Sequence, residues 1–163
     1  MKNILIFSIV CWVLLGCSSE EKPDCDYGYT ITKEALASCH KAAEQGEALA
    51  QIYLGNKYQH GKGEVTRDFA QAVQWYKKAA KQGWATAQYD LGQMYFRGEG
   101  VTRDYNQAFQ WFKKAAEQGD AKVQHILGTM YDQGKGVEED DKQAVHWYRK
   151  AAEQNHAPAQ SNL

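Results

Sequence analysis

One segment occurs three times in this chain, and the repetition constrains the fold more than any other feature. Leu91-Gly92 recurs as Leu127-Gly128 thirty-six positions later, and Trp111 recurs as Trp147 in the same register. An earlier copy begins near Glu47. A unit of this length cannot bury its apolar face alone, so about three units must stack to be stable. The sequence therefore predicts a stack of repeats.

Each copy is expected to form two helices joined by a loop. Apolar and small residues at three- and four-residue spacing predict the first helix, over residues 47–60, 84–97 and 120–133. A Gly-x-Gly pair ends each of these helices, because glycine readily adopts the positive φ of a turn. A valine follows each pair and is expected to anchor the loop in the core. These valines are Val65, Val101 and Val137.

The second helix is expected to begin at an aspartate that is followed by glutamine three residues later, as in Asp104 and Gln107. The carboxylate would accept hydrogen bonds from the exposed backbone amides of the first turn. This helix is expected to end at Gly83, at Gly119 and, in the last copy, at Asn155. Asparagine is the next most permissive residue for a left-handed cap.

The repeats divide residues 32–163 into three units and two partial ends. The units span about 47–83, 84–119 and 120–155, and the partial ends span 32–46 and 156–163. The first end resembles a second helix with Ser38 in place of tryptophan, and the last begins another first helix. The expected fold is an all-α, αα-solenoid of three helix hairpins with partial capping helices at both ends.

Residues 1–16 have a different character. They carry one lysine and an apolar run that is short for a membrane span of ~20 residues but suits a secretory signal. The sequence Leu-Leu-Gly before Cys17 resembles the lipobox of bacterial lipoproteins, which implies cleavage and lipidation at Cys17. An uncleaved anchor helix, or a simple signal with a chance cysteine, is the alternative. Residues 17–31 would form a polar tether. By the same resemblance, Ser18 stands where the signal for retention in the inner membrane would have aspartate, which implies an outer-membrane protein facing the periplasm in a Gram-negative host.

If Cys17 is lipidated, two thiols remain in an oxidising compartment. A disulfide between Cys25 and Cys39 is therefore the natural hypothesis. A metal site is the competing idea, but no cluster of histidine or cysteine accompanies these residues. The five histidines are dispersed without ligand spacing, so no metal or cofactor is expected.

The net charge of the chain is −1, and acidic and basic residues are interspersed. This pattern argues against a nucleic-acid-binding face and against a polybasic membrane patch. The lipid on Cys17 is therefore the expected contact with the membrane.

The unit A-x-A-Q-x-x-L-G-x-x-Y-x-x-G-x-G-V-x-x-D-x-x-x-A-x-x-W-x-x-x-A-A-x-x-G resembles the Sel-one-like repeat, a relative of the tetratricopeptide repeat. The resemblance covers about residues 33–163; the departures are Glu64, Ser38, Val123 and Asn155. It implies a right-handed solenoid that binds a protein or peptide on its concave face. Bacterial members are often exported and occur in the cell envelope.

By the same resemblance, the first helix of each unit lines the concave face. The positions that vary between copies there are the candidate partner-binding residues, with Tyr89 and Phe96 as exposed aromatic anchors. The alternative is that these positions are exposed and unconstrained. The candidates are Ile52, Asn56, His60, Tyr89, Gln93, Phe96, Arg97, His125, Thr129 and Asp132.

Some members of this family carry a β-lactamase or penicillin-binding label, and two short motifs fit Ser-x-x-Lys. These are Ser19 with Lys22 and Ser38 with Lys41. Neither has a Ser-Asp-Asn or Lys-Thr-Gly partner, so catalysis and a small-molecule substrate are not expected. The sequence predicts a non-enzymatic adaptor that binds an unidentified envelope or periplasmic protein. An inhibitor or immunity protein against a secreted toxic effector is the alternative.

Overall fold

The computed structural model describes residues 32–61 and 64–162 of the 163-residue chain. Within those two ranges the chain forms eight helices and no strand, so the predicted all-α fold is confirmed. The helices are α2 (Lys33–Glu44), α3 (Ala48–His60), α4 (Phe69–Lys81), α5 (Ala85–Arg97), α6 (Tyr105–Ala116), α7 (Ala121–Asp132), α8 (Asp141–Glu153) and α9 (Ala157–Gln160). The predicted signal and tether, with Cys17 and Cys25, lie outside the described residues.

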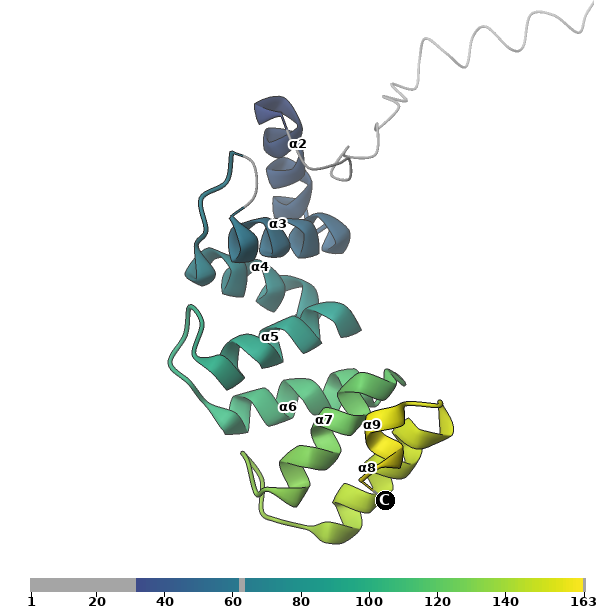
Figure 1. Cartoon of the computed structure of the whole chain (residues 1–163). Helices are drawn as coiled ribbons and strands as arrows, with labels where there is room; N and C mark the ends of the chain where they lie inside the picture. The colour runs from purple at the N-terminus through teal and green to yellow at the C-terminus, as the bar shows by residue number, and fades with distance from the viewer. Residues whose placement is uncertain (1–31, 62–63, 163) are drawn as a thin grey trace, which may run out of the picture.

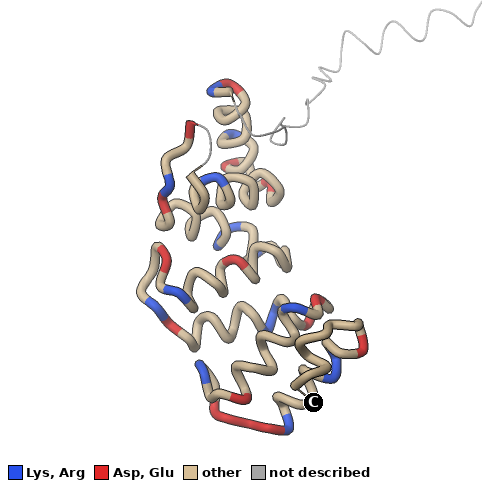
Figure 2. The backbone as a smooth tube through the Cα atoms, in the orientation of Figure 1, with Lys and Arg blue, Asp and Glu red and all other residues tan. Residues whose placement is uncertain are grey.

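The helices stack in chain order into the predicted αα-solenoid (Figure 1). Each repeat is a hairpin, α3 with α4, α5 with α6 and α7 with α8, and successive hairpins pack through α4 on α5 and α6 on α7. Helix α2 packs on α3 at one end, and the short α9 packs on α8 at the other. Ala159 of α9 is fully buried, as expected of a capping helix. Charges of both signs alternate along the solenoid (Figure 2).

The second helix of each hairpin begins and ends as predicted. The Asp104 carboxylate accepts a hydrogen bond of 2.9 Å from the backbone N–H of Gln107. Asp68 and Asp140 accept the equivalent bond, at 3.0 Å each. The backbone just beyond the helix has positive φ in all three copies. The residues concerned are Gly83, Gly119 and Asn155, with φ of 95°, 104° and 62°.

The Leu-Gly pair is repeated because the glycine allows the two helices of a hairpin to approach closely. A Cβ atom on Gly92 would lie 2.8 Å from the ring of Phe112. The same relation holds between Gly55 and Tyr76, and between Gly128 and Tyr148. A methyl group there would force the aromatic ring out of its packed position. The leucine of each pair is fully buried.

Glutamines join neighbouring repeats in a ladder that recurs along the solenoid. Gln88 of α5 is buried and donates its amide N–H to the carbonyl of Ala80, at the end of the preceding repeat. Its Oε1 accepts a hydrogen bond of 2.8 Å from Gln118, which also donates to the carbonyl of Gly83. These bonds bring side-chain donors to carbonyls at the end of the preceding repeat. Gln51 and Gln124 hold the equivalent places in the other repeats.

Candidate protein-binding groove

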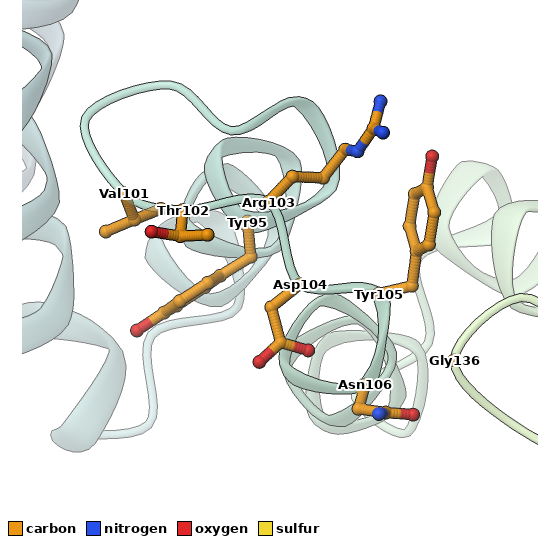
Figure 3. A pocket seen from close by; sticks show the side chains of 8 residues that line it. All are labelled: Tyr95, Val101, Thr102, Arg103, Asp104, Tyr105, Asn106 and Gly136. Atoms are coloured by element: carbon orange, nitrogen blue, oxygen red, sulfur yellow. The ribbon is translucent and has the colours of Figure 1, made fainter.

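One cavity, of about 620 Å³, lies beside the loop between α5 and α6. Its lining includes the loop anchor Val101, the cap Asp104 and Gly136 of the next repeat (Figure 3). In the same view Arg103 and Tyr105 extend away from the loop, and the guanidinium lies 5.5 Å from the centre of the tyrosine ring. Since the lining residues cap and pack the scaffold, this cavity belongs to the architecture of the repeat.

A second, smaller cavity of about 290 Å³ lies between α5 and α7, the first helices of the second and third repeats. We call this cavity the α5/α7 groove. Its floor is buried and apolar, because Phe112 and Met130 are exposed by only 1% and 2%. Phe96 and Ile126 are partly buried beside them. The lining residues are Gln93, Phe96, Phe112, His125, Ile126, Thr129, Met130, Gln133 and Lys135.

Four of the ten candidate residues meet in this groove. They are Gln93, Phe96, His125 and Thr129. The remaining candidates do not line it. Ile52, Asn56 and His60 lie on α3, one repeat earlier; Arg97 and Asp132 end α5 and α7; and Tyr89 lies on α5. Their role in binding stays a prediction.

The two predicted aromatic anchors are less exposed than expected. Tyr89 and Phe96 are both partly buried, with their ring centroids 6.0 and 6.4 Å from that of Phe112. Their burial follows from the closeness of α5 to α6, which the glycine at position 92 permits.

Lysines lie over the aromatic rings on this side of the solenoid. The Lys135 ammonium is 5.9 Å from the centre of the Phe96 ring, and the Lys122 ammonium is 5.0 Å from the Tyr89 ring. The hydrogen bond to Tyr89 and the charge interaction with it raise the pKa of Lys122. Of these two lysines, Lys135 lines the groove, so the apolar floor has one basic side chain at its border.

His125 connects the groove to the C-terminal cap. Its ring centroid lies 5.5 Å from that of Tyr148 and 5.2 Å from that of His156. Its Nε2 is 3.1 Å from Nδ2 of Asn162, so the neutral ring accepts a hydrogen bond there. Burial, followed by the proximity of His156, lowers the pKa of His125.

Sequence reasoning missed the floor of the groove. Phe112, Met130 and Lys135 line the groove but are not among the predicted candidates. Ile126 could have been found, because its position changes from Tyr53 to Asp90 to Ile126 along the three repeats. This variation between copies is the same criterion that selected the neighbouring candidates His125 and Thr129.

The other predicted sites receive no new support. Ser38 is exposed on α2, and Cys39 is fully buried there, but Cys25 lies outside the described residues, so their pairing stays a prediction. Residues 32–61 and 64–162 hold no group of three side chains suited to binding a metal ion. None of the helices described is long and apolar enough to span a membrane.

The three hairpins match the Sel1 repeat, at residues 48–84, 85–120 and 121–156. No curated protein matches the chain. Among solved structures, the chain is similar to a protective antigen of uropathogenic Escherichia coli strains that displays an SLR fold. The two share 45% identity with a TM-score of 0.73, over 77% of this chain and 27% of the antigen. The chain thus spans about a quarter of that relative's length.

Two further solved structures are matched by this chain over nearly their whole length. A Sel1 repeat protein from Oxalobacter formigenes is 35% identical, with a TM-score of 0.70, over 78% of this chain and 96% of its own. Helicobacter pylori cysteine rich protein B is 27% identical, with a TM-score of 0.60, over 80% of this chain and 93% of its own. These similarities agree with the helical-repeat solenoid described above.

Proposed function

Because the chain belongs to the Sel1 repeat family, we propose that it is a non-enzymatic adaptor of the bacterial cell envelope that binds a segment of a partner protein in the α5/α7 groove. Sel1 repeat proteins are generally scaffolds for protein–protein interaction. The observation that carries the proposal is the groove itself, which has a buried apolar floor and a polar, basic border.

The groove has the composition of a protein interface. Aromatic residues and methionine are enriched at the centres of such interfaces, and polar residues form the rim. Phe96 and Met130 supply the first kind, and Gln93 and Gln133 supply the second. Small pockets of this sort typically receive one apolar side chain of the partner, around which the polar rim excludes water.

The proposed location of the protein in the cell envelope rests on the sequence of the N-terminal segment. The lipobox-like ending before Cys17 supports export and a lipid anchor, with residues 17–31 as a tether to the solenoid. The Escherichia coli relative is a protective antigen, which accords with an exported protein. The partner would then be another envelope or periplasmic protein.

Site-specific photocrosslinking in living cells tests the proposal. A photoreactive amino acid in place of Gln133, on the groove rim, should give a crosslinked partner. The same substitution at Gln110, an exposed glutamine of α6 outside the groove lining, should give none. Ile126→Arg should remove the Gln133 product, because the long cation fills the groove while its charge reaches solvent. Equal crosslinking at both positions, or an unchanged product with Ile126→Arg, would contradict the proposal.

A further inference from the structure

The charges that line the α5/α7 groove have one sign. Of its nine lining residues, Lys135 and His125 can carry a charge, and both are basic. The other lining side chains are apolar, or polar and uncharged. A partner segment that enters the groove therefore meets positive charge, and none of the residues that line the cavity offers it a carboxylate.

Lys135 supplies this charge from a partly buried position beside the apolar wall. Most basic side chains of the described residues are exposed, whereas Lys135 is not fully so. Its ammonium lies 5.9 Å from the centre of the Phe96 ring, which lines the same cavity. Residues 32–61 and 64–162 form two ion pairs within 4.0 Å, and Lys135 is in neither. A partly buried ammonium beside an apolar surface favours a carboxylate as its neighbour.

The repeat itself does not require a lysine at this position. The equivalent residue of the second repeat is Glu99, which pairs with Arg97 at 3.9 Å. Gly134 and Gly136, on either side of Lys135, supply the positive φ of the turn, so the turn does not fix the residue between them. The charge of Lys135 is therefore a property of this groove and not of the scaffold.

The positive charge and the apolar floor are close enough to bind one short segment. Phe96 forms part of the wall that would receive an apolar side chain, and Lys135 lies over its ring. An ion pair brings a carboxylate oxygen to about 2.8 Å from the ammonium nitrogen. Side chains two residues apart in an extended segment lie on the same face, about 7 Å from each other. An apolar and an acidic side chain two residues apart therefore match the groove.

From this arrangement we infer that the α5/α7 groove binds a partner segment that carries an apolar side chain and, two residues away, an aspartate or a glutamate. The inference rests on the proposed function and adds the chemistry of its partner. The apolar side chain covers Phe112 and Met130, and the carboxylate pairs with Lys135. The amide of Gln133, which also lines the groove, is a further N–H donor for the carboxylate. A lysine or arginine in the segment would instead be repelled by Lys135.

Methionine methyl signals measure binding at the floor of the groove. Met130 lies in the floor, and Met94 is fully buried outside the lining, so it is an internal control. Purified protein labelled with carbon-13 at its methionine methyl groups is titrated at pH 8 with glycine–serine peptides that carry leucine and glutamate two residues apart, in both orders. The Met130 signal should shift and the Met94 signal should not. His125, whose pKa is lowered, is neutral at this pH, so Lys135 is the charge tested.

Two changes in the peptide test the two parts of the ligand. Replacing its glutamate by glutamine should weaken binding about two- to fivefold, as expected for a partly exposed ion pair. Replacing the glutamate by lysine should weaken binding further, because like charges are then opposed. Replacing the leucine by serine should also weaken binding, because the apolar floor stays uncovered. Equal affinity for the glutamate and lysine peptides, or no shift of Met130 with any peptide, overturns the inference.

Charge reversal in the protein assigns the preference to Lys135. Lys135→Glu should reverse it, so that the lysine peptide binds more tightly than the glutamate peptide. Lys142→Glu makes the same change of charge at an exposed position of α8 outside the groove lining, and it should leave the preference intact. Circular dichroism checks that both variants are folded. The inference is overturned if Lys135→Glu keeps the wild-type preference, or if Lys142→Glu reverses it as well.

The photocrosslink at Gln133 separates this inference from the proposed function. If the crosslink forms and Lys135→Glu leaves it unchanged, the adaptor proposal stands and the acidic–apolar ligand is wrong. If the glutamate peptide binds as expected but Gln133 gives no crosslink in cells, the chemistry of the groove is supported and the adaptor proposal fails.

Other occupants of the groove give different results. Self-association that depends on Lys135, detected by size-exclusion chromatography with light scattering, would assign the groove to a second copy of the chain. Tighter binding of octanoate than of the leucine–glutamate peptide, measured by the same Met130 signal, would assign it to an acyl chain. Either result overturns the inference.

Discussion

Replacing Asp90 by asparagine should stabilise the protein, although it removes a charged residue. Burial raises the pKa of this carboxyl from 3.8 to about 6 in the folded state. A group whose folded pKa is raised costs stability once it is ionised, because the unfolded chain loses the proton first. The contribution of Asp90 to the free energy of unfolding therefore falls as the pH rises from about 4 to about 6 and then stays level.

The size of this effect follows from the shift in pKa. One pKa unit corresponds to about 1.4 kcal/mol, so a shift of about two units corresponds to roughly 3 kcal/mol. Since asparagine resembles the protonated carboxyl in shape and charge, Asp90→Asn should raise the free energy of unfolding by about 2–3 kcal/mol at pH 8. Near pH 4 the gain should be close to zero.

Urea denaturation at the two pH values, followed by circular dichroism, measures both quantities. Asp132→Asn is the matched control, because an exposed substitution should change stability by less than about 0.5 kcal/mol. A loss of stability at pH 8 would refute the reasoning, since it would mean that Asp90 gains more from Lys122 than it loses by burial. An equal gain at pH 4 would refute it as well.

Three more changes have expected outcomes. Gly92→Ala should lower the free energy of unfolding by about 1–3 kcal/mol in urea denaturation, because the new methyl group would overlap Phe112. Lowering the pH through about 6.5 should reduce the protection of the α9 amides against hydrogen exchange, measured relative to the intrinsic exchange rate at each pH. His125, whose folded pKa is lowered, keeps its stabilising contacts above that range and loses them as it takes up a proton. Cys17→Ser should abolish incorporation of labelled palmitate.

Each change has a control on the same scaffold. Gly83→Ala introduces a methyl group into open space at positive φ, so it tests backbone strain without overlap. His125→Asn should remove the pH dependence of this protection in α9, and His146→Asn, on the exposed side of α8, should not. Cys25→Ser should leave the incorporation of palmitate intact. Incorporation of palmitate into Cys17→Ser would contradict the lipid anchor.

Much of the fold could be predicted because its signals are local. Asp104 caps a helix through a bond to a residue three positions away, and Gly83 needs only its own left-handed φ. The glutamine ladder could not be predicted in this way. Gln118 bonds to Gln88, thirty residues earlier in the same repeat, and only the folding of the whole hairpin brings them together. A repeated glutamine on the sequence does not reveal its partner.

The candidate site was predictable in part for the same reason. Variation between copies identified Gln93 and His125, which do line the groove. The groove floor depends on how closely α5 and α7 lie over α6, and no local pattern fixes that distance. Phe112 therefore resembled any core residue. Asp90 escaped notice because its effect comes from burial, which the sequence of a helix does not show.

The glutamine ladder also bears on how such a protein changes over evolutionary time. Gln88 and Gln118 bond only within their own repeat and to the repeat just before it. Any two hairpins that carry these glutamines can therefore be neighbours. After a whole repeat is duplicated or lost, the same hydrogen bonds can form between the repeats that then adjoin. The scaffold can grow or shorten freely, while each new junction brings another groove whose lining is open to selection.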